Sequence, residues 1–290
     1  MKILRLATMN RPNAISLLGA SSLILLLGTA SCKQQEGAAD AKKQDSTRIS
    51  DSAAATTPQP PGLDDTTELK ATLDTTAPTP LATAPPDLAA DVIPLRTPDG
   101  GVTRYGIRSG RVLMKFTGNS RGTRTLTFND YGMHERKEER TIPYPPGQSK
   151  GAINNLIFIT TAEYGAYADM RTKMGWRRKN EGVSRYLAST DAKSSSFADY
   201  VVKNSGAERL PDTTIAGYHC KVLRKSVGGM TVTNWIWRGV LIREQLISKA
   251  DNYESTVEPV EITTNIDVPA STFEFPAGYK ISDYAPPQGK

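Results

Sequence analysis

The chain's cysteines and histidines are the residues best suited to nucleophilic or acid–base chemistry, and they are few: Cys32, Cys220, His134 and His219. A cysteine becomes a nucleophile when a nearby histidine accepts its proton. His219 and Cys220 are adjacent, and adjacent residues of a β-strand point to opposite faces, so this pair is not expected to share a site. A pairing of His134 with Cys220 stays open. We favour a buried, unreactive Cys220 thiol that packs beside Tyr218 and Val222.

Other catalytic signatures are absent from the sequence. It contains no glycine-rich phosphate-binding loop and no cysteine cluster with metal-ligand spacing, and two histidines are few for a histidine-based metal site. We therefore expect no metal, no cofactor and no enzymatic activity. A hydrolase that uses Cys220 and His134 is the enzymatic alternative.

Cys32 is the cysteine whose surroundings predict a specific modification. Residues 1–31 begin with basic side chains, continue with an apolar run over 14–27, and end in the small residues Gly-Thr-Ala-Ser. This layout is typical of an export signal, and the segment resembles a bacterial lipobox. The resemblance implies cleavage before Cys32 and acylation of its sulfur and its new amino group. Two or three acyl chains would anchor the mature protein firmly to a membrane.

Residues 1–31 allow two other interpretations. The same small residues suit ordinary secretory cleavage after Ala30, which exports the chain without an anchor. An uncleaved membrane-spanning helix is disfavoured, because the apolar run is shorter than the roughly 20 residues that cross a bilayer and contains serines. Both cleavage interpretations export the chain. We expect a lipid-anchored protein of the cell envelope, at the outer membrane, with its periplasmic or surface side left open.

The charge of the chain is unevenly distributed. Its formal net charge is +6, but the predicted signal holds three basic residues and no acidic ones. Residues 95–290 hold 28 basic and 20 acidic residues. A basic exported surface suits anionic lipids or glycans, whereas nucleic acid is a poor partner for a chain that leaves the cytoplasm. An ordinary mixed-charge surface is the simpler interpretation.

Residues 32–94 are predicted to form a disordered tether. The segment 33–94 has no Phe, Tyr or Trp and is rich in Ala, Thr, Pro and Asp. It cannot bury enough apolar area to offset the entropy lost on ordering. Four Asp-Ser/Thr pairs in it resemble the acceptor motif of Bacteroidetes O-glycosylation. The acceptors that this resemblance implies are Ser46, Ser52, Thr66 and Thr75.

Residues 95–285 are predicted to form one mainly β domain, followed by a disordered tail at 286–290. Apolar and polar residues alternate at 112–116 and 125–128, with a hairpin loop between them at 118–122. The further predicted strands are 155–161, 165–170, 175–179, 216–224, 230–238, 241–247 and 256–266. Helix is scarce, and the best candidate is 196–203, where serines can cap the first turn. Residues 164–174 also permit a helix, but a hairpin around 171–174 is favoured.

Many antiparallel strands with one or two short helices predict a curved sheet or open half-barrel. Its concave face must be filled by its own side chains or by a ligand. Seven apolar residues of the predicted strands are candidates to line such a cavity: Val112, Met114, Phe116, Leu126, Phe128, Trp235 and Trp237. The alternative for each is an ordinary core position, because aromatic residues at alternate strand positions usually pack in a core.

Three segments of the second half resemble the LolA/LolB-like fold of exported lipoproteins, in the form found among Bacteroidetes lipoproteins of unassigned function. They are the segment 210–221 with its Gly-Tyr-His-Cys strand, the segment 235–240 that begins Trp-Ile-Trp-Arg-Gly, and the segment 273–281 with its Phe-Glu-Phe-Pro-Ala-Gly-Tyr edge. The resemblance implies an incomplete barrel of antiparallel strands around an apolar cavity. It does not carry over the role of a soluble lipoprotein carrier, because this chain is expected to be anchored.

These patterns predict an envelope lipoprotein that binds a hydrophobic or amphipathic ligand, such as a lipid or acyl chain, in the concave face of a half-barrel. The alternative is an envelope sensor or scaffold that binds a protein or glycan without lipid transfer, through a partner that the sequence does not identify. Basic residues at 173–179, with Arg136, Lys137 and Arg140, suit contact with anionic lipid or glycan. The preferred interpretation of these basic residues is a solvated strand edge that charge protects from aggregation.

Overall fold

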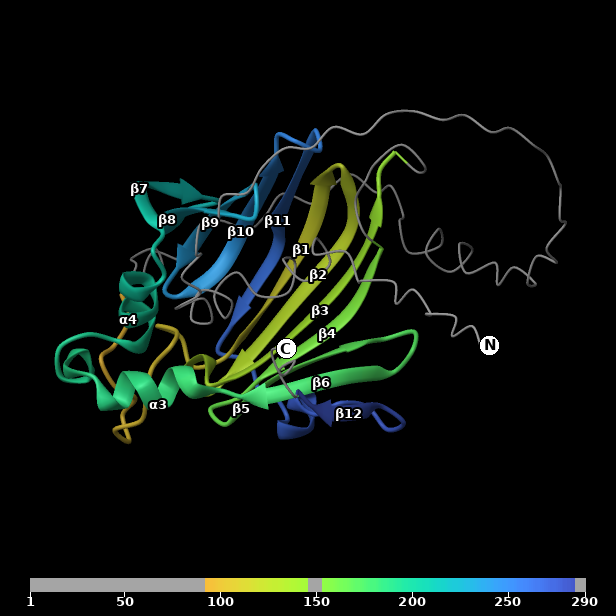
Figure 1. Cartoon of the computed structure of the whole chain (residues 1–290). Coiled ribbons are helices and arrows are strands. Elements are labelled where there is room, and N and C mark those ends of the chain that lie inside the picture. Colours follow the sequence, from red (N-terminus) through yellow and green to blue (C-terminus); the bar gives the residue numbers. More distant parts are fainter. Residues whose placement is uncertain (1–91, 146–152, 285–290) are drawn as a thin grey trace, which may run out of the picture. The chain divides into compact units, whose positions relative to one another are not determined.

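The computed structural model describes residues 92–145 and 153–284 (Figure 1). The predicted signal, Cys32, the four glycosylation acceptors, nearly all of the predicted tether and the tail at 286–290 lie outside these residues. No helix within the described ranges is both long enough and apolar enough to cross a membrane.

The described residues form a single sheet of twelve strands, and its order is β12-β6-β5-β4-β3-β2-β1-β11-β10-β9-β8-β7. All neighbours pair antiparallel except β12, which runs parallel to β6. The predicted mainly β, open and curved antiparallel sheet is therefore confirmed. The strands are β1 (Gly110–Gly118), β2 (Ser120–Asn129), β3 (His134–Pro143), β4 (Asn154–Thr160), β5 (Tyr164–Asp169), β6 (Met174–Lys179), β7 (Glu208–Ile215), β8 (Tyr218–Val227), β9 (Met230–Trp237), β10 (Val240–Ser248), β11 (Tyr253–Thr264) and β12 (Lys280–Asp283).

Alternation of apolar and charged residues explains the first hairpin. Val112, Met114 and Phe116 are buried on one face of β1, whereas Arg111 and Lys115 of the other face are exposed and Leu113 is partly buried. The last residues that β1 and β2 pair are Phe116 and Gly122, so the connection spans 117–121, within one residue of the predicted loop at 118–122. The backbone N–H of Asn119 donates to the Glu254 carbonyl, and its side-chain oxygen accepts from the Glu254 N–H. Strand β11 therefore fixes this turn.

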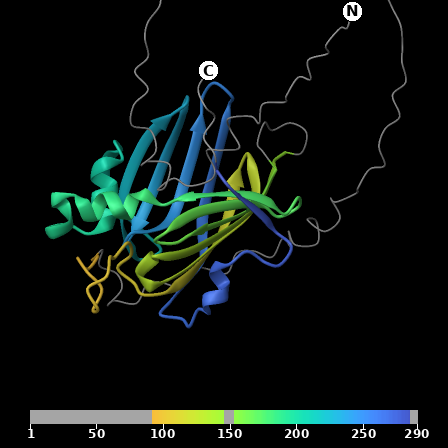
Figure 2. The ribbon, with the colours of Figure 1, turned by 60° about the horizontal axis from the view of Figure 1, so that its bottom comes forward.

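The face that bears Val112 is concave. Arg124 of β2 shares this face, since it pairs opposite Met114, and its guanidinium lies 2.9 Å from a carboxylate oxygen of Glu244 in β10. Three strand spacings separate β2 from β10, which is roughly 14 Å in a flat sheet and beyond the reach of these side chains. The sheet must bend toward this face, and register shifts in the β1–β11 and β9–β10 pairs assist the bend. Figure 2 shows the blue strands β8–β11 running across the green strands β4–β6.

Two short helices lie together at one end of the strands (Figure 1). Helix α4 (Phe197–Asn204) confirms the helix predicted at 196–203, and the Ser196 hydroxyl caps it by accepting from the Asp199 N–H. Helix α3 (Glu181–Ala188) was not predicted. The two helices share a small apolar core, and Asp199 pairs with Lys221 of β8 at 3.5 Å. The single-turn 3₁₀ helices are η3 (Asp130–Gly132), η4 (Thr190–Lys193) and η5 (Ala270–Phe273).

The opposite, convex face of β4 and β5 is covered by the chain near η5. Ile157 and Ile159 of β4 point to this face, and Val268 and Phe273 pack against them. Phe158 lies between the two isoleucines in sequence and therefore points to the concave face. Strand β4 thus carries apolar side chains toward both faces.

Candidate ligand-binding face

The predicted cavity residues lie in one apolar cluster. Six of them are at most 4% exposed, whereas Trp235 is partly buried and packs against the cluster. The Trp237 ring meets the Tyr218 ring edge-on, with centroids 4.5 Å apart. The protein's own side chains therefore fill the space around these residues, and a role in contacting a ligand stays a prediction for them. The six buried residues are Val112, Met114, Phe116, Leu126, Phe128 and Trp237.

A row of directly paired residues continues from this cluster across the concave face. Leu126 pairs opposite Lys137, Lys137 opposite Phe158, Phe158 opposite Tyr167, and Tyr167 opposite Trp176. Phe158, Tyr167 and Trp176 form an aromatic row, with ring centroids 6.1 and 5.6 Å apart. Exposure rises along it, from 6% at Phe158 to 43% at Trp176. The aromatic row therefore joins the buried core to solvent.

Lys137 stands in this row between Leu126 and Phe158. Its ammonium lies 4.3 Å from the centroid of the Phe158 ring, a cation–π contact. Burial lowers the pKa of Lys137 to about 8, the positive charge of Arg124 acts in the same direction, and nearby carboxylates oppose both. Lys137 was predicted to belong with the basic surface residues. Its position over Phe158 on the concave face separates it from them.

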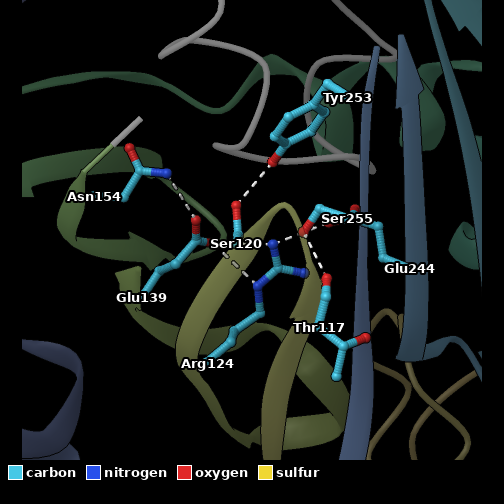
Figure 3. A network of polar contacts seen from close by, with 8 residues as sticks. All are labelled: Thr117, Ser120, Arg124, Glu139, Asn154, Glu244, Tyr253 and Ser255. Atoms are coloured by element: carbon cyan, nitrogen blue, oxygen red, sulfur yellow. Dashed lines mark hydrogen bonds and ion pairs between the residues drawn. The ribbon is translucent and has the colours of Figure 1, made fainter. Parts of the chain in front are cut away.

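A buried ionic network lies beside the row (Figure 3). The Nε and Nη2 atoms of Arg124 donate to Glu139 at 3.1 and 2.9 Å, and Nη2 also donates to Glu244 at 2.9 Å. Burial alone would lower the pKa of Arg124, but Glu244 and Glu139 raise it above its ordinary value. Asn154 donates to the second oxygen of Glu139 at 3.2 Å. The network holds β2, β3, β4 and β10 together across the concave face.

Two buried polar atoms in this region have no hydrogen-bond partner among the residues that the structure describes. They are Nη1 of Arg124, a donor, and Oδ1 of Asn234, an acceptor. Asn234 of β9 pairs opposite Glu244 of β10, the carboxylate that Arg124 contacts. A buried polar atom without a partner is costly, and water or the polar group of a ligand would relieve that cost. The concave face thus combines apolar contact area with unsatisfied polar groups.

The cysteine and histidines that are candidates for nucleophilic or acid–base chemistry do not lie together on the concave face. Cys220 is fully buried and its thiol donates to the Tyr218 carbonyl at 3.2 Å, whereas His219 is exposed. The prediction that these two neighbours point to opposite faces is confirmed. His134 packs against the Phe273 ring and lies 3.9 Å from Asp130. Within residues 92–145 and 153–284, no group of three or more His, Cys, Asp or Glu side chains is placed to hold a metal ion.

The remaining predicted basic residues are also separated. Arg136 donates to the carbonyls of Thr272 and Glu274 and pairs with Glu138, so it holds the convex-face segment. The basic residues of β6 are exposed. The structure therefore does not bring Arg136 and Lys137 into one patch with β6.

The concave-face residues Arg124, Phe158, Tyr167 and Trp176 were not predicted as site residues. Three of them lie in segments that were predicted as strands, but their alignment depends on which strands pair and in which register. Lys137 lies in β3, a strand that the sequence analysis missed. No local signal in a single sequence would have found the row.

Comparison with known proteins gives distant likenesses to solved structures. No family model matches the chain, and no curated protein matches it. An uncharacterized conserved protein from Thermus thermophilus is 7% identical, with a TM-score of 0.39 over 61% of this chain and 91% of that one. MucB in the Pseudomonas aeruginosa MucA/MucB complex is 11% identical, with a TM-score of 0.31 over 58% of this chain and 56% of that one.

A third structure is described as a putative outer membrane lipoprotein-sorting protein domain from Vibrio parahaemolyticus. It is 8% identical, with a TM-score of 0.28 over 57% of this chain and 89% of that one. At TM-scores below 0.5 these likenesses carry no functional information. The strand pairing itself shows the curved open sheet. That this sheet has the specific form of the LolA/LolB-like fold stays a prediction.

Proposed function

We propose that this protein is a membrane-anchored lipoprotein of the cell envelope that binds a hydrophobic or amphipathic ligand, a lipid or an acyl chain, on the concave face of its sheet. Binding without catalysis is proposed. The observation that carries the proposal is the aromatic row, which leads from the exposed Trp176 to the buried Phe158. An apolar chain laid along the row would cover the exposed part of these rings.

The chemistry of the row suits a ligand with an apolar chain and a polar group. Each methylene that is buried contributes about 0.8 kcal/mol, so six of them contribute roughly 5 kcal/mol before the costs of association. The Lys137 ammonium stands at the inner end of the aromatic row. The unpaired donor of Arg124 lies on the same face. The Arg124 atom supplies a hydrogen-bond donor for a polar headgroup, and Lys137 supplies positive charge near it.

Binding of a fluorescent fatty acid to the full chain tests this proposal. The variant Tyr167→Ala removes the middle ring of the row and should weaken binding by up to about tenfold, because one aromatic contact contributes roughly 0.5–1.5 kcal/mol. Tyr164→Ala is the matched control, since Tyr164 lies on the same strand but packs on the convex face. Equal affinities for both variants, or no saturable binding by the wild-type chain, would refute the proposal.

The alternative proposal is an envelope scaffold or sensor that binds a protein or glycan partner without lipid transfer. Two observations favour it: the core cluster is filled by the protein's own side chains, and β7 is the end strand of the sheet with mostly exposed residues. Crosslinking in cells separates the alternatives. A scaffold should trap one protein partner reproducibly, whereas a lipid-binding protein should yield crosslinked lipid.

Acylation of Cys32 is the part of the proposal that fixes location. Mass spectrometry of the mature amino terminus should find the chain beginning at Cys32 with acyl groups attached. The Cys32→Ser variant should lose the acyl groups and leave the membrane fraction. A mature chain that begins after Ala30 would contradict anchoring and would leave the ligand proposal intact.

A further inference from the structure

The β5–β6 hairpin carries an exposed surface that is both apolar and basic. Met174 and Trp176 are 54% and 43% exposed, which is high for side chains of this size and type. Both point to the same face of β6, because they are two residues apart. Three exposed cations lie near them: Lys173 in the turn before β6, Arg178 on the same face, and Lys179 at the end of β6 on the opposite face. We call these five residues the hairpin surface.

The positive charges of the hairpin surface are not neutralised nearby. The neighbouring Arg171 and Arg177 pair with Asp169 at 3.5 Å and Asp283 at 2.8 Å, respectively. Lys173, Arg178 and Lys179 form no ion pair with any acidic side chain of the part of the chain that the structure describes. The hairpin surface therefore presents two apolar side chains and three uncompensated cations, of which Lys173 and Arg178 lie beside the apolar side chains and Lys179 lies on the reverse face of the strand end.

Protection of a bare strand edge does not account for the hairpin surface as a whole. Strand β12 pairs with residues 174–177 of β6, from Lys280 opposite Met174 to Asp283 opposite Arg177. The Tyr284 N–H continues this pairing by donating to the Arg177 carbonyl. The outer edge of β6 is therefore covered by hydrogen bonds as far as Arg177, and Arg178 and Lys179 lie beyond this pairing. Charge is not needed along the covered part to prevent edge-to-edge association, and exposed Met174 and Trp176 would work against such a role.

We propose that the hairpin surface docks on an anionic lipid bilayer. Tryptophan favours the headgroup region of a membrane, with its ring among the acyl chains and its N–H toward water. Lysine and arginine beside it would contact lipid phosphates. Three such cations strengthen docking on an anionic surface on the order of 100-fold, and salt screens this contribution. This docking does not depend on ligand binding in the concave face and goes beyond the function proposed above.

Docking at this place would also orient the domain. Trp176 is the exposed end of the aromatic row, so contact between Trp176 and a bilayer puts that end against lipid. An acyl chain that leaves the bilayer would meet the row without crossing water. This consequence, unlike the docking itself, rests on the proposed function.

Fluorescence quenching by brominated lipids tests the docking in the full chain. The chain is incorporated into vesicles whose acyl chains carry bromine, and the Trp176→Phe variant gives the background from the other tryptophans. Because bromine quenches only tryptophans that reach the acyl region, an acyl anchor at Cys32 does not produce the signal. We expect Trp176 to be quenched in vesicles of phosphatidylcholine with phosphatidylglycerol, and much less in phosphatidylcholine alone.

A charge variant and a matched control complete the test. The triple variant Lys173→Gln, Arg178→Gln, Lys179→Gln should lose most of the quenching, as should the wild-type chain at about 0.5 M salt, because docking weakens roughly 100-fold. The control triple Arg108→Gln, Arg111→Gln, Lys115→Gln removes three exposed cations elsewhere and should keep it. Quenching of Trp176 that is equal in both lipid mixtures, absent in both, or equally reduced by the two triples would overturn the proposal. The charge variant should still bind fatty acid in solution, which separates this test from that of the concave face.

Discussion

Replacement of Lys137 by methionine tests whether the fold buries its ammonium on the concave face, where the charged form is disfavoured. Burial lowers the pKa of Lys137 from 10.5 to about 8. The folded protein therefore disfavours the protonated amine, and the unfolded chain binds more protons between pH 8 and 10.5. Since stability rises with pH wherever the unfolded state binds more protons, the contribution of Lys137 becomes less unfavourable across this window.

The size of this effect follows from the shift. One pKa unit corresponds to about 1.36 kcal/mol, so the contribution of Lys137 to the free energy of unfolding should rise by about 3 kcal/mol between pH 8 and 10.5. Partial exposure of the side chain makes this an upper bound. Methionine keeps the apolar stem without the charge. Lys137→Met should be more stable than wild type at about pH 7.5, and the difference should shrink as the pH approaches 10.5.

Urea unfolding at about pH 7.5, 9 and 10 measures this difference for the two proteins. Other groups, such as the Tyr105 hydroxyl whose pKa burial raises well above its ordinary value, titrate in both chains and cancel in the comparison. A stability difference that stays constant with pH, or that grows in favour of the variant, would refute the assignment of Lys137 to a desolvated site.

Three other contacts can be tested by simpler measurements. Arg124→Met should destabilise the protein by about 3–5 kcal/mol, since it leaves Glu139 and Glu244 buried without their cation, and adding Glu139→Gln and Glu244→Gln should recover most of that loss in urea unfolding. Ser196→Ala should cost about 1 kcal/mol in the same assay through loss of the α4 cap, and an unchanged stability would contradict the capping role. The Cys220 thiol should be unreactive toward a disulfide reagent in the folded chain and reactive in urea, and fast labelling without urea would show that it is accessible.

Strict alternation made part of the fold predictable from the sequence. Val112, Met114 and Phe116 are buried as the pattern indicates, and Ser196 caps the one helix that the sequence analysis named. Alternation of apolar and polar residues indicates which face of a strand is buried. It does not indicate which other strands pair with that strand. The hairpin between β1 and β2 was therefore predicted together with its loop, whereas the contact of Asn119 with Glu254 of β11 was not.

Strand β3 was missed for a different reason. Its sequence is rich in Glu and Arg, and charged residues are depleted in strands. Glu139 is nevertheless buried, because Arg124 comes from the neighbouring strand to pair with it. Burial of such a residue depends on a distant partner and not on its own hydrophobicity. The same dependence on register concealed the aromatic row, whose members lie on three strands.

Photolabelling of the full chain with a diazirine fatty acid tests the central claim most directly, because it reports where an acyl chain lies. After irradiation, peptide mass spectrometry locates the labelled residues. We expect saturable labelling on the concave face of β4, β5 and β6, at Phe158, Tyr167 and Trp176, and little labelling of Tyr164 on the convex side. Labels confined to the convex face, or spread over the chain without saturation, would contradict this claim.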